Sequence, residues 1–115
     1  MQSTLETPVE QALAATIHVY RADLIDFCRR LLQTPSVNGV DDERHVAEVI
    51  AAEARRLGLE VRIEGQDAAR PNVIVSTSAA GETGLLLLGH LDTVPPGDPA
   101  SWDYPPFSGT VADGR

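Results

Sequence analysis

The hydrophobic period of the chain changes from that of a helix to that of a strand near Gly58. Before this glycine, apolar residues recur at steps of three and four, which is the spacing of a buried helix face. After it, Leu59, Val61 and Ile63 alternate with charged residues, as in a strand with one solvent-exposed face. A chain of 115 residues that contains both periods is expected to fold as an α/β protein.

Two helices are predicted in the N-terminal half of the chain. The first covers residues 9–33. Thr34 terminates it, because the residue before a proline is pushed out of the helical region. The second begins near Asp41, which would be its N-cap, and ends at Gly58 after a last turn with two arginines. The acidic residues 41–43 are therefore interpreted as a helix start and not as a cation site.

Three strands are predicted after the second helix. Two cover residues 59–64 and 72–78, and the short connection "GQDAARP" cannot hold a helical crossover, so we expect them to pair antiparallel. The third, "LLLLGH" at 85–90, is apolar on both faces, which is typical of a central strand covered above and below. Two helices are too few to cover both faces of this mixed β-sheet, which indicates that the chain is incomplete. An ordered loop is expected over 95–115.

Charge and composition limit the partners of the chain. Its formal net charge of −8 repels phosphate backbones and anionic lipids, so we expect neither nucleic acid nor a membrane as partner. All nine basic residues are arginine, which excludes a lysine Schiff base and a P-loop lysine. The lone Cys28 cannot form an internal disulfide, and the N-terminal residues do not resemble a signal peptide, so a cytoplasmic location is expected.

His90 and Asp92 lie at the carboxyl end of the predicted central strand, the edge at which ligands bind in open α/β sheets. Residues i and i+2 of an extended chain point to the same side, so both side chains leave the strand together while Leu91 turns into the core. A histidine that binds a metal commonly donates its other ring N–H to a carboxylate. We therefore interpret His90 as a metal ligand and Asp92 as its orienting carboxylate. The alternative is a polar turn cap at the strand end.

The motifs around these residues resemble a known family. "GHLDTVPPGD", a tryptophan, "PPFSG" and "DGR" are similar to the first metal-site segment of the co-catalytic zinc peptidases and deacylases, and "TPSVNG" and "RPNVIV" extend the resemblance weakly upstream. This family includes acetylornithine deacetylases, succinyl-diaminopimelate desuccinylases, glutamate-type carboxypeptidases and aminoacylases. The resemblance implies that residues 1–115 are the N-terminal portion of a larger zinc-hydrolase catalytic domain of the phosphorylase/hydrolase-like fold, without its lid or dimerisation domain.

The same resemblance implies a site and a reaction. His90 would bind one of two zinc ions, for which cobalt or manganese could substitute, and Asp92 would act in the catalytic site by orienting His90. The reaction would be hydrolysis of an amide bond in an N-acyl amino acid or small peptide, by a metal-bridged water that a glutamate activates. The full-length protein could form a homodimer. The family's bridging aspartate and paired glutamates follow "DGR" and are not in this sequence, so the isolated chain is expected to be inactive.

A second hypothesis is that the chain is a non-catalytic module, either a degenerate relative of these enzymes or a small acidic interaction protein. Under both hypotheses the predicted strands leave exposed edges and an uncovered apolar face. Such surfaces predict that the isolated chain is marginally stable or self-associates.

The other chemically active side chains are interpreted as structural. His18 and His45 have no partner at ligand spacing and are expected at surface or boundary positions, and Cys28 is expected to pack as a small buried or boundary side chain. Asp98 and Asp103 lie in a loop rich in proline and glycine, where aspartate commonly serves in turns. The loop is expected to wrap onto the domain through four further residues: Trp102, Pro105, Pro106 and Phe107.

Overall fold

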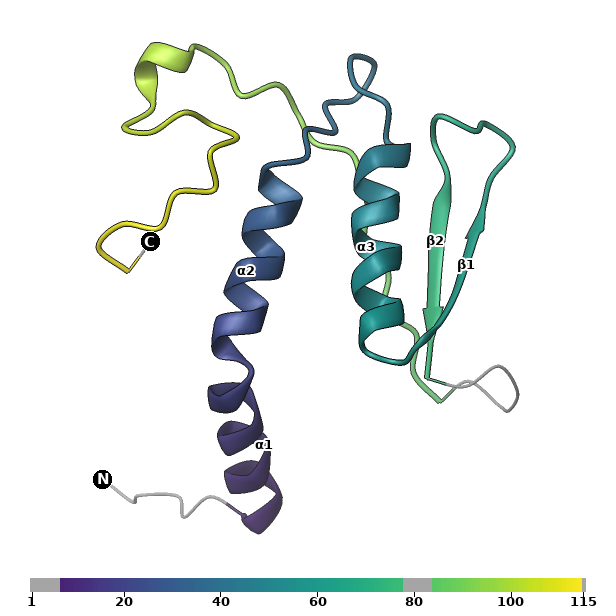
Figure 1. Ribbon diagram of the computed structural model, residues 1–115, viewed down its shortest axis with the longest axis vertical. Helices are drawn as coiled ribbons and strands as arrows, with labels where there is room; N and C mark the ends of the chain where they lie inside the picture. The colour runs from purple at the N-terminus through teal and green to yellow at the C-terminus, as the bar shows by residue number, and fades with distance from the viewer. Residues whose placement is uncertain (1–6, 78–83, 115) are drawn as a thin grey trace.

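The structure, a computed structural model, describes residues 7–77 and 84–114. Its elements are, in chain order, α1 (Pro8–Val19), α2 (Arg21–Leu32), α3 (Arg44–Arg56), β1 (Glu60–Glu64), β2 (Asn72–Ser76) and the short 3-10 helix η1 (Pro99–Ser101). In Figure 1, α1 and α2 form one column, α3 stands beside α2, and the β1–β2 hairpin packs on the other side of α3. The α/β class is confirmed. The predicted strand end at Ser78 and the last residue of "DGR" lie outside the described residues.

The predicted helix over residues 9–33 is two helices, because the chain bends at Tyr20. Tyr20 has φ −89° and ψ 5°, which ends α1 before α2 begins. The β-branched residues Thr16, Ile17 and Val19 come just before the bend, where their restricted side chains lower helix propensity. Apolar periodicity continues through the bend, so the sequence pattern did not predict it.

The second predicted helix, α3, begins at Arg44 and not near Asp41, because Asp41 caps a group of the preceding turn and the acidic residue that accepts from the first N–H of the helix is Asp42. The Asp41 carboxylate accepts a hydrogen bond from the Val37 N–H over 2.8 Å and closes a turn before the helix. The Asp42 carboxylate accepts one from the Arg44 N–H over 3.0 Å. The helix end near Gly58 is confirmed, and this glycine has φ 74°, the left-handed conformation that favours glycine after a helix.

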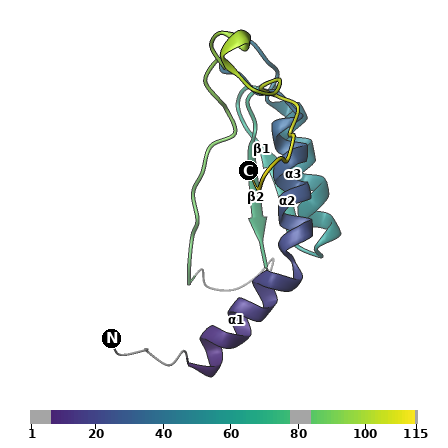
Figure 2. The same ribbon diagram turned by 90° about the vertical axis from the view of Figure 1, so that its left-hand side faces the viewer.

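The sheet has two strands and is antiparallel, which corrects the expected mixed sheet. β1 and β2 pair as the short connection predicted, with Val61 opposite Val75. Among the described residues, "LLLLGH" pairs with neither strand, and Figure 2 shows this segment running apart from β2. The side chains of Leu85 to Leu88 are 77–94% exposed. A run that is apolar on both faces becomes a central strand only when it is covered on both, and the described residues do not cover it.

The core forms around α3 and is small. Its buried apolar side chains are alanines and valines: Val37, Val46, Ala47, Ala51 and Ala54. Short side chains on α3 let this helix approach both α2 and the hairpin, which lie on opposite sides of it (Figure 1). Within residues 7–77 and 84–114, no helix combines the length and the apolar character that a bilayer crossing requires.

The C-terminal loop is ordered against α2, as expected. The Arg29 Nε donates to Gly109 O over 2.8 Å, and the Gln33 amide donates to Ser108 O over 2.9 Å. Gly109 has φ 60°, and a Cβ atom there would lie 3.1 Å from the carbonyl oxygen of Arg29, so this contact requires glycine. Trp102 is half exposed, and its indole N–H donates to Pro96 O over 3.0 Å within the loop.

Candidate functional site

A parallel β-bridge between Val37 and Thr93 holds the predicted metal-site segment. The Asn38 N–H donates to Thr93 O over 3.0 Å, and the Thr93 N–H donates to Ser36 O over 2.9 Å. The Ser36 hydroxyl adds a third hydrogen bond, to Leu91 O, over 2.8 Å. Ser36 and Val37 are buried, and the bridge fixes the turn after α2 against the segment that follows the leucine run.

His90 and Asp92 contact each other through the imidazole Nδ1 atom. Nδ1 lies 2.7 Å from the backbone oxygen of Asp92 and 3.1 Å from its carboxylate Oδ1. Both oxygens can only accept hydrogen bonds, so in the neutral ring Nδ1 carries the proton and Nε2 carries the lone pair. The His90 side chain is 80% exposed. The ring is therefore in the tautomer that a metal ligand bonded through Nε2 needs.

The second carboxylate oxygen of Asp92 accepts a hydrogen bond from a residue that spacing does not single out. Asn38 Nδ2 lies 2.8 Å from Asp92 Oδ2. Arg70 Nη2 donates to Asn38 Oδ1 over a long 3.4 Å, and Arg70 Nε lies 3.9 Å from Glu43 Oε1. The Glu43 N–H also donates to Ala69 O over 3.0 Å, which ties the Arg70 loop to the start of α3. We call Asp92, Asn38 and Arg70 the carboxylate relay.

Hydrogen bonds from its neighbours favour the ionised form of Asp92. The hydrogen bond from Asn38 is the largest cause that lowers the pKa of the Asp92 carboxyl, and the bond to His90 acts in the same direction. An ionised carboxylate accepts from Nδ1–H and cannot donate to Nδ1. The charge state of Asp92 thus supports the tautomer that the geometry of His90 indicates.

The described part of the chain does not by itself supply the ligands of a metal centre. Residues 7–77 and 84–114 contain no group of three histidine, cysteine, aspartate or glutamate side chains that could hold a metal ion. Zinc sites use three or four protein ligands. His90 with its oriented ring fits one coordination position of a metal such as zinc, for which neutral imidazole is a suitable ligand.

The other candidate residues lie away from His90 in their contacts, and most have the structural roles expected. His18 and His45 are exposed, and Asp98 caps η1 by accepting from the Ala100 N–H over 2.9 Å. The expectation of a buried or boundary Cys28 is wrong, because this side chain faces solvent on α2.

Sequence patterns mark neither Asn38 nor Arg70 as a site residue. The only signal is that they occur in "TPSVNG" and "RPNVIV", the upstream segments that share the family resemblance. No local spacing connects them with Asp92, because the Asn38–Asp92 contact joins residues 54 positions apart.

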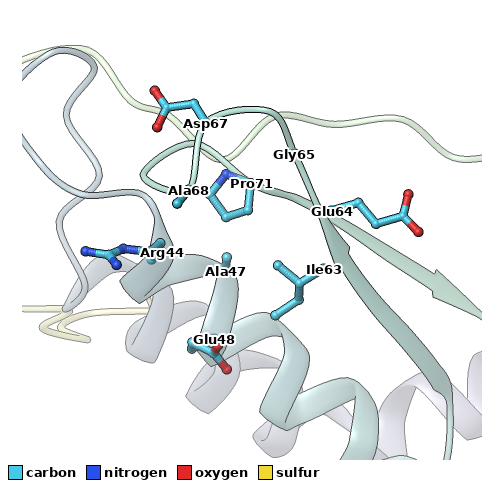
Figure 3. Close-up of a pocket in the computed structure, with 9 residues that line it drawn as sticks. All are labelled: Arg44, Ala47, Glu48, Ile63, Glu64, Gly65, Asp67, Ala68 and Pro71. Carbon is cyan, nitrogen blue, oxygen red and sulfur yellow. The ribbon is translucent and has the colours of Figure 1, made fainter.

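An open cavity of about 170 Å³ lies beside His90. Its lining is mainly apolar and comes from the end of α2, from α3, from the segment after His90 and from the C-terminal loop: Leu31, Leu32, Pro35, Val46, Ile50, Leu91 and Phe107. A second open cavity, of about 240 Å³, lies between α3 and the β1–β2 connection, and Figure 3 shows Ala47, Ile63 and Pro71 around it. This second cavity contains none of the predicted site residues.

Comparisons with known proteins support the family resemblance. No protein-family model and no solved structure matches the chain. Among curated proteins, it is 34% identical over 93 residues to a succinyl-diaminopimelate desuccinylase of Methylocella silvestris, which covers 78% of this chain and 24% of the relative. It is 40% identical over 96 residues to an acetylornithine deacetylase of Aliivibrio fischeri, which covers 78% of this chain and 25% of the relative. The chain belongs to this family of desuccinylases and deacetylases.

A second desuccinylase shows similar coverage. The chain is 40% identical over 91 residues to the succinyl-diaminopimelate desuccinylase of Blochmanniella pennsylvanica, and the match covers 76% of this chain and 23% of the relative. The chain thus spans about a quarter of the length of the curated desuccinylases and deacetylases that it matches.

Proposed function

We propose that the chain is the N-terminal portion of the catalytic domain of a longer metal-dependent hydrolase, which cleaves amide bonds in N-acyl amino acids or small peptides. The names of the relatives support the reaction class, because they denote removal of a succinyl or an acetyl group. The quarter-length matches support the assignment to a portion of a longer enzyme.

The observation that carries the proposal is the contact between His90 and Asp92. Nδ1 of His90 faces two acceptor oxygens of Asp92, which leaves Nε2 as the ring atom for a metal. His90 would bind one zinc ion of a two-metal site, or cobalt or manganese in its place. When bound, the metal would supply a Lewis acid for the acyl carbonyl of the substrate.

The residues of this chain would position that ligand. Asp92 holds the imidazole proton on Nδ1, and the bridge between Val37 and Thr93 fixes the backbone from which both side chains extend. The remaining metal ligands, the general base and the groups that bind the substrate would come from the part of the enzyme that these 115 residues do not include. The isolated chain is accordingly proposed to be inactive.

The test is hydrolysis by the longer protein that contains this chain, with N-succinyl and N-acetyl amino acids as substrates. Loss of a group that only supports a metal ligand typically costs about 10- to 100-fold, so the loss of the ligand itself in His90→Ala should cost more than about 100-fold. The matched control is His45→Ala, which removes an exposed histidine of α3 and should retain activity. Equal hydrolysis by His90→Ala and the unchanged protein would contradict the role of His90, and no hydrolysis by the unchanged protein would favour the non-catalytic alternative.

A further inference from the structure

We propose that Asn38 is a positioning residue for His90, which acts by holding the carboxylate of Asp92, and that Arg70 holds the amide of Asn38 in turn. The inference rests on the proposed function of His90 as a metal ligand. It extends that function to a residue on the turn between α2 and α3, 54 positions from Asp92 in the sequence.

The amide group of Asn38 has only one favourable orientation. Arg70 can only donate hydrogen bonds, and the ionised carboxylate of Asp92 can only accept them. The amide oxygen must therefore face Arg70 and the amide NH₂ must face Asp92, which is the arrangement with 3.4 Å to Nη2 and 2.8 Å to Oδ2. A flipped amide would place oxygen against oxygen and NH₂ against the guanidinium. Each hydrogen bond of the carboxylate relay therefore has a fixed donor: Arg70 donates to Asn38, and Asn38 donates to Asp92.

The backbone of Asn38 is fixed although its side chain is exposed. Its N–H donates to Thr93 O over 3.0 Å in the β-bridge. On either side of it, the N–H of Val37 donates to the Asp41 carboxylate over 2.8 Å, and the N–H of Asp41 donates to Val37 O over 2.9 Å. The turn is therefore closed without the Asn38 amide. The Asn38 side chain is exposed and makes its two hydrogen bonds outside the core. We therefore attribute its role to orienting Asp92 and not to packing.

Holding one oxygen of Asp92 determines where the other lies. With Oδ2 bonded to Asn38, Oδ1 remains 3.1 Å from Nδ1 of His90. Without Asn38 the carboxylate can rotate away, and only the backbone oxygen of Asp92, at 2.7 Å, would still accept from Nδ1–H. Loss of a group that supports a metal ligand typically costs about 10- to 100-fold in metal affinity, and the remaining backbone contact places Asn38 near the lower end, at about tenfold.

The first test is the imidazole tautomer in the 115-residue chain, free of metal and labelled with ¹⁵N. The ring nitrogen shifts distinguish the Nδ1–H from the Nε2–H tautomer, and His18 and His45 give internal references in the same spectrum. In the unchanged chain, at a pH where the ring is neutral, we expect His90 to be mainly Nδ1–H. In Asn38→Ala the His90 signals should move towards those of the references. An unchanged His90 tautomer in this variant would overturn the proposal.

Two further variants keep this result interpretable. Asn72→Ala removes the other asparagine of the chain, at the start of β2, and should leave the His90 tautomer unchanged. If Asn38→Ala does not fold, Asn38→Ser replaces it, because serine is tolerated in turns but is too short to bridge Arg70 and Asp92. A tautomer shift in Asn38→Ser supports the proposal, and an unchanged tautomer overturns it.

The second test separates this inference from the proposed function. Zinc chloride is titrated into the longer protein after metal removal, for the unchanged protein, His90→Ala, Asn38→Ala and Asn72→Ala. Loss of one of the two zinc ions in His90→Ala, with about tenfold weaker binding of that ion in Asn38→Ala, supports both. Loss in His90→Ala with unchanged affinity in Asn38→Ala overturns the role of Asn38 alone. Retention of both zinc ions by His90→Ala, with unchanged affinity, overturns the proposed function and the positioning role for metal binding that rests on it.

Discussion

The guanidinium of Arg30 in α2 donates to the carboxylate of Glu53 in α3, with 2.6 Å between Nη2 and Oε2. Arg56 binds the other carboxylate oxygen of Glu53, also over 2.6 Å. Glu53 is buried, whereas the Arg30 side chain is 39% exposed. This ion pair joins α2 and α3, the two helices on either side of the turn that carries Asn38. The stability of the helix pair and the geometry of the site are therefore linked.

Removing the charge of Glu53 should destabilise the chain. Glu53→Gln leaves Arg30 and Arg56 without their shared carboxylate in a partly buried setting, so we expect a lower Tm in thermal unfolding followed by circular dichroism. Glu48→Gln is the matched control, since Glu48 is an exposed glutamate on the same helix. Equal Tm values for the two variants would show that the α2–α3 ion pair adds no stability.

Acid should destabilise the chain by protonating the carboxylates of Glu53 and Asp42. Hydrogen bonds from Arg56 and Arg30 lower the pKa of Glu53 from its ordinary 4.5 to about 2, and those from Arg44 lower the pKa of Asp42 from 3.8 to about 2. Between these values the unfolded chain binds more protons than the folded chain, so the free energy of unfolding falls as the pH falls from about 4.5 to about 2. Urea unfolding across this range should show the decrease, and Glu53→Gln should flatten it.

The centre of α3 should not tolerate a larger side chain. Ala51 is 0% exposed in the small core, so Ala51→Leu should cost about 1–3 kcal/mol of unfolding free energy through overpacking. The neighbouring Ala52 is exposed on the same helix, and Ala52→Leu should be nearly neutral. Urea denaturation measures both, and a neutral Ala51→Leu would show that the space around α3 is not filled as described.

The exposed leucine run should make the isolated chain self-associate. Leu86 and Leu88 are 78% and 94% exposed, and an extended apolar segment without a paired neighbour is a site for contact between chains. Sedimentation velocity should show concentration-dependent association, and the double variant Leu86→Ser with Leu88→Ser should reduce it. A single monomeric species at all concentrations for the unchanged chain would contradict this account.

Local sequence signals predicted part of the fold. Gly58 marked the end of α3, and the short connection before Pro71 predicted the antiparallel hairpin. The bend at Tyr20 was missed because apolar spacing continues across it. The start of α3 was misplaced because Asp41 caps the Val37 N–H instead of the helix. Leu85 to Leu88 were assigned to a central strand from their composition, but strand formation depends on neighbours that the described residues do not provide.

The sequence predicted the site contact between residues two positions apart, but not the site contacts between residues far apart in the chain. His90 and Asp92 are two positions apart, and their contact follows from extended geometry and the need of a ligand histidine for an acceptor. The support from Asn38 and Arg70 depends on how the turn after α2 and the β1–β2 connection fold against the 90–93 segment. Such contacts depend on the tertiary structure, which the hydrophobic periodicity of a sequence does not reveal.

Metal content tests the central claim most directly. The longer protein that contains this chain is purified in its unchanged form and as His90→Ala and His45→Ala, and zinc per protein is measured by inductively coupled plasma mass spectrometry. With His90 as a ligand, the unchanged protein and His45→Ala should retain the same zinc content, and His90→Ala should retain less. Equal zinc content in all three proteins would contradict the assignment of His90 as a metal ligand.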